Sequence, residues 1–106
     1  DYKKNDDNMR KSPTQIIFEK LEAIGAQVDF HDTHFPEIPF MRDHPKLQGR
    51  KSVALDEKTL AQFDAVIVAT EHSNVDYAFV AKHSKLVVDT RNAMRHVVDR
   101  SHIVKA

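Results

Sequence analysis

The sequence predicts an α/β fold, in which an open, mostly parallel, Rossmann-like sheet carries helices on both faces. Two observations lead to this prediction. Short apolar, β-branched runs alternate along the chain with amphipathic segments that carry helix-start signals. Two of the runs are almost wholly apolar, as is typical of strands covered on both faces of a parallel sheet. These runs are DAVIVAT at 64–70 and KLVVDT at 85–90.

The first predicted element is a helix over residues 13–24. Ser12 caps it, Pro13 takes the first helical position, where its missing N–H costs nothing, and Gln15 completes a capping box. Gly25 stands where a left-handed C-cap is expected. An apolar stripe with helical spacing predicts the buried face. It consists of Ile17, Leu21 and Ile24, and Ile16 and Phe18 widen it. Because a helix in a βαβ unit follows a strand, we expect that the first strand of the sheet is truncated and that the chain is a fragment of a longer one.

The remaining elements continue the alternation. AQVDF at 26–30 has the composition of a strand, whereas three prolines between His31 and Gly49 indicate a long surface connection. The later predicted elements are a short strand within 50–55, a helix at 56–63, a strand at 64–69, a helix at 74–83, a strand at 85–89, a short closing helix and an edge strand at 102–105. This order predicts right-handed βαβ units within one domain over residues 1–106.

Composition limits the classes of partner. The 106 residues include 16 basic and 16 acidic side chains, so no bulk charge attracts the chain to nucleic acid or to an anionic membrane. The apolar runs are far shorter than a membrane span. The absence of cysteine excludes disulfides, thiolate metal sites and a cysteine nucleophile within these residues. We therefore expect a soluble, cytoplasmic protein with neither nucleic acid nor a membrane as partner.

Two cationic loops are predicted to lie at one edge of the sheet. YKKNDDNMR at 2–10 precedes the first helix, and Asp89-Thr90-Arg91 follows the strand at 85–89. In open α/β sheets ligands bind at the carboxyl ends of the strands, next to helix N-termini that attract anions. The two loops therefore predict an anion site.

Five motifs in order carry a resemblance to a known family. They are YKKNxDxMRxSP, GAxVDxHDxHxPEIP, HPxLxGRKSV, DAVIVATEH and VVDTRNAM. In this order and spacing they resemble the C-terminal UDP-binding domain of the UDP-glucose/GDP-mannose dehydrogenase family, over nearly the whole chain to about Met94. Within the family the chain is most similar to the bacterial UDP-N-acetylglucosamine 6-dehydrogenases of surface-polysaccharide synthesis.

The resemblance implies a homodimeric enzyme that oxidises the C6 alcohol of a UDP-sugar to a carboxylate in two NAD-dependent steps. In this family the cysteine nucleophile and the glycine-rich dinucleotide loop belong to the part upstream of this domain. The chain has only two glycines and no GxGxxG. We therefore expect it to bind the UDP-sugar, to work with its own N-terminal NAD-binding domain, and to be inactive alone.

The resemblance also implies the site residues. Tyr2 and Lys3 would contact the UDP-sugar, and Arg91 would form a hydrogen-bonded fork to the nucleotide sugar. Arg10 would reach toward NAD. The family usually has aspartate two residues before this arginine, where the chain has Asn8. No residue of the chain is assigned to catalysis or to a metal.

Two chemical alternatives stay open at the level of single residues. His31, Asp32 and His34 are adequate metal ligands, but loop hydrogen bonding is the commoner role for such residues. Glu71 and His72 follow the strand at 64–69 at the ligand edge, where a catalytic base is conceivable, although a loop histidine is more often solvated.

Three functions compete at the level of the whole chain. The leading interpretation is the UDP-sugar-binding domain of a UDP-N-acetylglucosamine 6-dehydrogenase, with UDP-glucose or UDP-N-acetylmannosamine as alternative substrates. A stand-alone, non-catalytic nucleotide-sugar-binding module is the second. A response-regulator-like domain is the third, but it would carry a lysine after a late strand, where this chain has Asp89-Thr90-Arg91.

Overall fold

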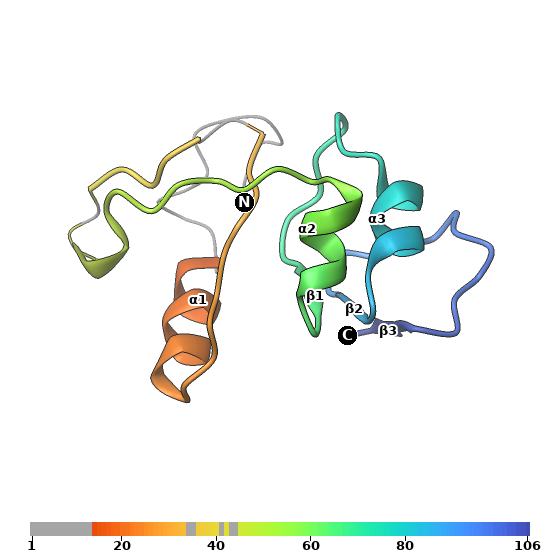
Figure 1. Cartoon of the computed structure of the whole chain (residues 1–106), viewed down its shortest axis with the longest axis horizontal. Helices are drawn as coiled ribbons and strands as arrows, with labels where there is room; N and C mark the ends of the chain where they lie inside the picture. The colour runs from red at the N-terminus through yellow and green to blue at the C-terminus, as the bar shows by residue number, and fades with distance from the viewer. Residues whose placement is uncertain (1–13, 34–35, 41, 43–44) are drawn as a thin grey trace. The chain divides into compact units, whose positions relative to one another are not determined.

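The computed structural model describes residues 14–33, 36–40, 42 and 45–106 of the chain (Figure 1). The chain divides into two compact units, Asp1–Val53 and Ala54–Ala106. Each unit has a hydrophobic core of its own. That the 106 residues form one domain stays a prediction.

The first unit contains the helix that the sequence predicts at 13–24, here α1 at Thr14–Ala23. Gly25 has a φ of 93°, which a residue with a side chain rarely adopts. It ends the helix, because Ala26 N–H then donates to Leu21 O at 3.1 Å and Gly25 N–H to Glu22 O at 3.0 Å, the Schellman pattern. The predicted C-cap is thus confirmed. Ser12 and Pro13 of the predicted N-cap lie outside the described residues.

The helix buries only part of the predicted apolar stripe. Phe18 is 4% exposed and forms the core of this unit with Ile38 and Leu47. Ile24, predicted to be buried, is 80% exposed. It lies in the turn after the last helical residue, where the helical spacing of side chains no longer applies.

The segment predicted as a long surface connection supplies two of the three buried residues that form this core. A 3-10 helix, η1 at Pro45–Leu47, buries Leu47 completely, and Ile38 is also buried. Ile38 N–H donates to Arg50 O at 2.8 Å, next to an isolated antiparallel bridge between Glu37 and Lys51. The prediction was wrong for these residues, because two apolar side chains in a proline-rich stretch are enough to anchor it. The short strand predicted within 50–55 is reduced to this bridge.

The strand predicted at 26–30 is also wrong in the described part of the chain. Val28 and Phe30 pack against the core, and Phe30 O accepts a hydrogen bond from Val53 N–H at 2.8 Å. The segment is extended, but a strand requires a ladder of bonds to a neighbouring strand. No such ladder forms here among the described residues.

The second unit contains a parallel three-stranded sheet, as predicted. Its strands are β1 at Val66–Val68, β2 at Val87–Asp89 and β3 at Ile103–Lys105, in the order β1-β2-β3. Both neighbouring pairs are parallel. The predicted Rossmann-like α/β class and the predicted edge strand at 102–105 are therefore confirmed.

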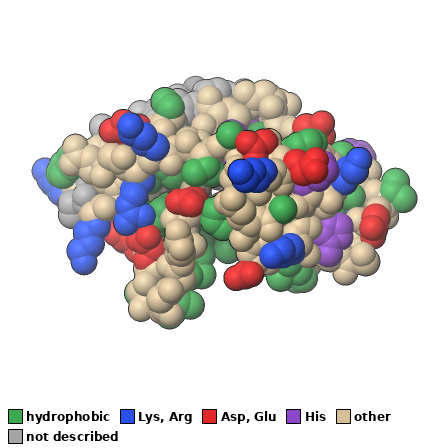
Figure 2. Space-filling view, in the orientation of Figure 1, with side chains coloured by type: hydrophobic (Ala, Val, Ile, Leu, Met, Phe, Trp, Pro, Cys, Tyr) green, Lys and Arg blue, Asp and Glu red, His purple; other side chains and the backbone are tan. Residues whose placement is uncertain are grey.

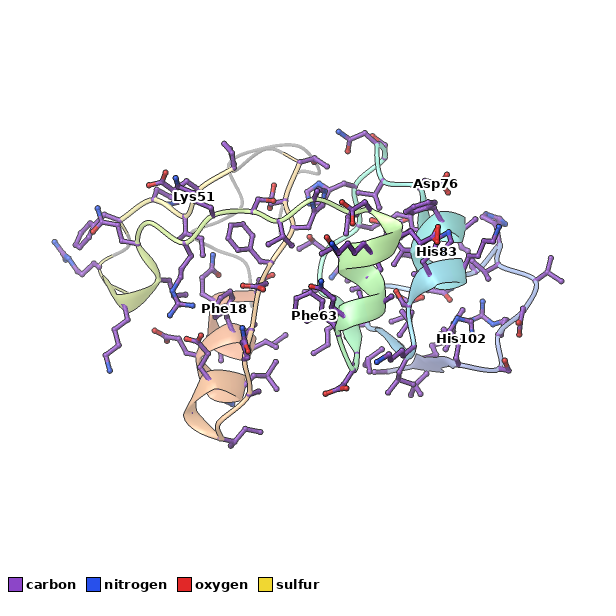
Figure 3. All side chains as sticks on the ribbon, viewed as in Figure 1. Phe18, Lys51, Phe63, Asp76, His83 and His102 are labelled. Atoms are coloured by element: carbon purple, nitrogen blue, oxygen red, sulfur yellow. The ribbon has the colours of Figure 1, made fainter. Side chains whose placement is uncertain are left out.

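Two capped helices of this unit lie side by side (Figure 1). α2 spans Glu57–Gln62 and α3 spans Tyr77–His83, close to the predicted ranges. Each begins after an aspartate whose carboxylate accepts a backbone N–H of the first turn. Asp56 accepts from Thr59 at 2.7 Å and Asp76 from Phe79 at 3.1 Å. Figure 3 shows Asp76 and His83 at the two ends of α3.

The core of this unit lies between the helices and one face of the sheet. Leu60 of α2 and Val80 of α3 pack in one cluster with Val68 and Val87 of the strands. The alternation of side chains along a strand sends Ile67 and Val104 to the opposite face, where they are 37% and 50% exposed. The sheet thus fixes the edge at which the loops after β1 and β2 emerge.

Candidate functional site

Arg91 lies two residues beyond the carboxyl end of β2, at the sheet edge where α/β proteins bind ligands. Its side chain is exposed. Within the described residues no hydrogen bond or ion pair engages its guanidinium. The other predicted site residues, Tyr2, Lys3 and Arg10, lie outside the described part of the chain, so their proximity to Arg91 stays a prediction.

Asp89, the last residue of β2, organises the loop that carries Arg91. Its side chain is completely buried. Oδ1 accepts the backbone N–H of Arg91 at 3.1 Å and of Ala93 at 3.0 Å, and Oδ2 accepts that of Met94 at 2.8 Å. The loop therefore folds around the carboxylate.

The charge state of Asp89 follows from two opposed effects. Burial raises the pKa of a carboxyl group, because it disfavours the charged form. The backbone N–H groups of Met94, Ala93 and Arg91 outweigh burial and hold the pKa of Asp89 below its usual range. The group is therefore ionised at neutral pH, and its charge is compensated by the loop itself.

The turn after Arg91 explains why the predicted closing helix does not form. Asn92 has a φ of 58°, in the left-handed region that asparagine tolerates better than most residues. Residues 93–96 form turns instead of a helix. Ala93 and Met94 are buried and donate their backbone N–H groups to Asp89, which fixes the end of the loop.

Thr90 attaches the same loop to the neighbouring strand. Its backbone N–H donates to Val68 O at 3.2 Å, and its hydroxyl donates to the same oxygen at 2.6 Å. Arg91 is thus preceded by a residue fixed to β1 and followed by residues fixed to Asp89.

The loop after β1 borders this loop and is itself held by hydrogen bonds. Arg95 donates to Glu71 at 3.0 Å, which joins the two loops, and to Asn92 O at 2.8 Å. His72 Nε2 lies in hydrogen-bond range of Thr70 Oγ1 at 3.1 Å, and its backbone N–H donates to the hydroxyl of Tyr77 at 2.8 Å. Burial raises the pKa of Tyr77. Glu71 and His72, the residues of the catalytic-base alternative, are therefore both engaged in fixing the rim of the site.

The residues of the metal alternative have loop contacts of the expected kind. His31 Nδ1 donates to Val53 O at 2.7 Å, and Asp32 N–H donates to Ser52 Oγ at 3.0 Å. His34 lies outside the described residues. In residues 14–33, 36–40, 42 and 45–106, no group of three potential ligands gathers to hold a metal ion.

The glycines of the chain do not lie where a dinucleotide-binding loop has them. A pyrophosphate loop needs glycines between a strand and a helix N-terminus. Gly25 instead follows the C-terminus of α1, and Gly49 follows the 3-10 helix. Neither glycine therefore stands at a strand-to-helix turn of the kind that holds a pyrophosphate.

The surface has no large region of one charge on the side shown. Figure 2 shows basic and acidic side chains interspersed there. Among the described residues, no helix is long and apolar enough to cross a membrane.

Sequence reasoning named Arg91 but missed the residues that hold it. Asp89 and Thr90 belonged to a loop interpreted by its charge alone, and Asn92 was assigned to a helix. A usable signal was present: an aspartate that ends a buried strand and precedes an asparagine by three residues is typical of a side chain that caps its own turn.

Comparison with known proteins agrees with the architecture and the motifs. No curated protein and no solved structure matches the chain. A family model, described as the UDP binding domain of the UDP-glucose/GDP-mannose dehydrogenase family, matches residues 1–96. This range includes α1, the sheet strands β1 and β2, and the whole Arg91 loop. The chain therefore belongs to the UDP-glucose/GDP-mannose dehydrogenase family, as its UDP binding domain.

Proposed function

We propose that this chain is the UDP-sugar-binding domain of an NAD-dependent UDP-N-acetylglucosamine 6-dehydrogenase. The full-length enzyme oxidises the C6 alcohol of the sugar to a uronic acid for surface-polysaccharide synthesis. It does so in the cytoplasm and as a homodimer. This chain binds the nucleotide of the UDP-sugar, and the N-terminal domain of the full-length enzyme supplies most of the NAD site.

The observation that carries the proposal is the exposed Arg91 on a fixed loop at the carboxyl edge of a parallel sheet. A guanidinium presents paired donors that match two phosphate oxygens. Because no described residue engages its guanidinium, no existing ion pair has to be broken when a diphosphate arrives. Tyr2 and Lys3 are proposed to complete the contact, and Arg10 to reach the NAD.

The chemistry of oxidation is assigned to the rest of the protein. The chain has no cysteine nucleophile, and its glycines do not form a dinucleotide loop. NAD supplies the hydride acceptor when it is bound. The role of the residues described here is to bind and orient the UDP-sugar, which lowers the entropic cost of the reaction.

The substrate is tested with the full-length protein. NADH formation is measured in parallel with UDP-glucose and with the UDP forms of N-acetylglucosamine, N-acetylgalactosamine and N-acetylmannosamine. The proposal expects the highest kcat/KM with UDP-N-acetylglucosamine. A preference for another UDP-sugar would reassign the substrate within the family. UDP binding without oxidation of any sugar would favour the non-catalytic module.

The site is tested with two arginine variants of equal charge change. Arg91→Ala is expected to weaken UDP binding in isothermal titration calorimetry. Arg42→Ala is the matched control, because Arg42 is an exposed arginine of the first unit and lies outside the Arg91 loop. Equal losses in the two variants would show that net charge, and not the Arg91 fork, binds UDP.

A further inference from the structure

The Arg91 loop contains a run of backbone N–H groups that converge on one point. Such a concave arrangement commonly binds an anion. In this chain the anion is the protein's own Asp89, whose two oxygens accept the N–H groups of Arg91, Ala93 and Met94. These backbone N–H groups are therefore already bonded to Asp89. The group of this loop that can still bind a phosphate is the side chain of Arg91.

The same contacts fix where that side chain begins. Thr90 is bonded to Val68 O through both its N–H and its hydroxyl. Ala93 and Met94 are buried and bonded to Asp89. Two residues, Arg91 and Asn92, are thus left to form the tip between two anchored ends. A loop that is ordered before binding loses less entropy when its ligand arrives.

We propose that Asp89 is a positioning residue, which acts through Arg91 by holding the loop in the conformation that presents the guanidinium to the diphosphate of the UDP-sugar. The proposal rests on the proposed function of Arg91. Asp89 itself does not touch the ligand, because its side chain is completely buried and its oxygens are taken by the backbone.

Asp89→Asn is the sharpest change, because it preserves size and removes one acceptor. An amide has one oxygen and one NH2 group, whereas the three backbone N–H groups need acceptors on both sides of the carboxylate. Either the Met94 contact or the paired Arg91 and Ala93 contacts must be lost. The tip should then sample several conformations.

The experiment is a double-mutant cycle in the full-length protein, with UDP as the probe and its Kd as the readout. Arg91→Ala and Asp89→Asn are each expected to weaken UDP binding at least about tenfold. The double variant should bind UDP no more weakly than Arg91→Ala alone, because Asp89 acts only through the Arg91 side chain, which that variant lacks. Val80→Ala, a buried change in α3, is the stability control and should leave the Kd unchanged.

The outcomes separate this proposal from the proposed function. If Arg91→Ala does not change the Kd, the assignment of Arg91 to UDP fails. If Arg91→Ala weakens binding but Asp89→Asn does not, the positioning role is overturned and the function stands. Fully additive losses, or an equal loss in Val80→Ala, would also overturn it.

A second variant keeps the test decisive if Asp89→Asn does not fold. Asn92→Ala changes a half-exposed residue and disfavours the left-handed backbone that turns the N–H groups toward Asp89. In the same cycle it should weaken UDP binding only when Arg91 is present. An unchanged Kd for Asn92→Ala would overturn the proposal as well.

Discussion

The guanidinium of Arg50 is paired with the carboxylate of Glu22 by two hydrogen bonds, of 2.8 and 3.1 Å, although 28 residues separate them. The guanidinium carbon also lies 5.4 Å from the centroid of the Phe18 ring. The pair lowers the pKa of Glu22 and raises that of Arg50. Arg50, which belongs to the motif HPxLxGRKSV, therefore links the segment after η1 to α1. This structural role explains the arginine in the motif without any contact to a ligand.

We expect Arg50→Lys to destabilise the first unit, although a positive charge is retained. Lysine is a point charge and cannot form two parallel bonds to Glu22 or stack as a plane on Phe18. The loss should be modest, since both side chains are partly exposed. It should also shrink in 1 M salt, where ion pairs at a surface are screened. Urea unfolding at low and high salt measures it, and an equal loss at both would assign the effect to packing.

Leu47→Ala should be far more damaging, because Leu47 is completely buried in the small core that it shares with Phe18 and Ile38. Truncations of this kind cost about 2–5 kcal/mol, through lost transfer free energy and the cavity left behind. The neighbouring Lys46→Ala changes an exposed side chain and is the control. Equal unfolding midpoints for the two variants would mean that the 3-10 helix is not part of the core.

Asp89 should make stability depend on pH in acid. Its pKa is lowered in the folded state, so the carboxylate stabilises the fold above the ordinary pKa of aspartate, about 4. This contribution is lost as the pH falls through the lower, folded-state pKa. At pH 7, Asp89→Asn leaves a buried N–H without its acceptor, which costs about 1–3 kcal/mol.

The difference in unfolding free energy between the wild type and Asp89→Asn is the quantity to measure. It should be constant from pH 7 down to about pH 5 and should shrink below about pH 4. Asp56, Asp99 and Glu22 also have lowered pKa values, but they are present in both proteins and cancel in the difference. A difference that grows in acid would show that the buried carboxyl is protonated in the folded protein.

The sequence predicted those elements whose signal is local. The strands β1 and β2 appear in the sequence as β-branched runs, and α1 and α3 are close to their predicted bounds. Both signals depend only on residues that are close together in the sequence. Even the left-handed turn at Gly25 was predictable, since few other residues adopt it.

What the sequence did not reveal depends on distant partners. Ile38 and Leu47 are core residues only because α1 brings Phe18 to them. Whether 26–30 becomes a strand depends on a partner strand that its own residues do not specify. The role of Asp89 was hidden for a similar reason, because its charge suggested solvent, whereas the backbone N–H groups of Arg91, Ala93 and Met94 are directed at it.

The last prediction concerns the loop at residues 2–10, which lies outside the described residues. If Lys3 and Arg91 bind one diphosphate, removing either in the full-length enzyme should raise KM for the UDP-sugar. The increase should correspond to about 1.5–3 kcal/mol of binding free energy, which the lost charge-assisted hydrogen bonds supplied. Arg10→Ala should act mainly on the KM for NAD, since we propose that Arg10 reaches the NAD. Lys4→Ala is the internal control and should change neither KM. Initial-rate kinetics with each substrate varied in turn separates these cases. Equal effects of Lys3→Ala and Lys4→Ala would mean that the loop acts only through its overall charge, and the contact between Lys3 and the diphosphate would have to be abandoned.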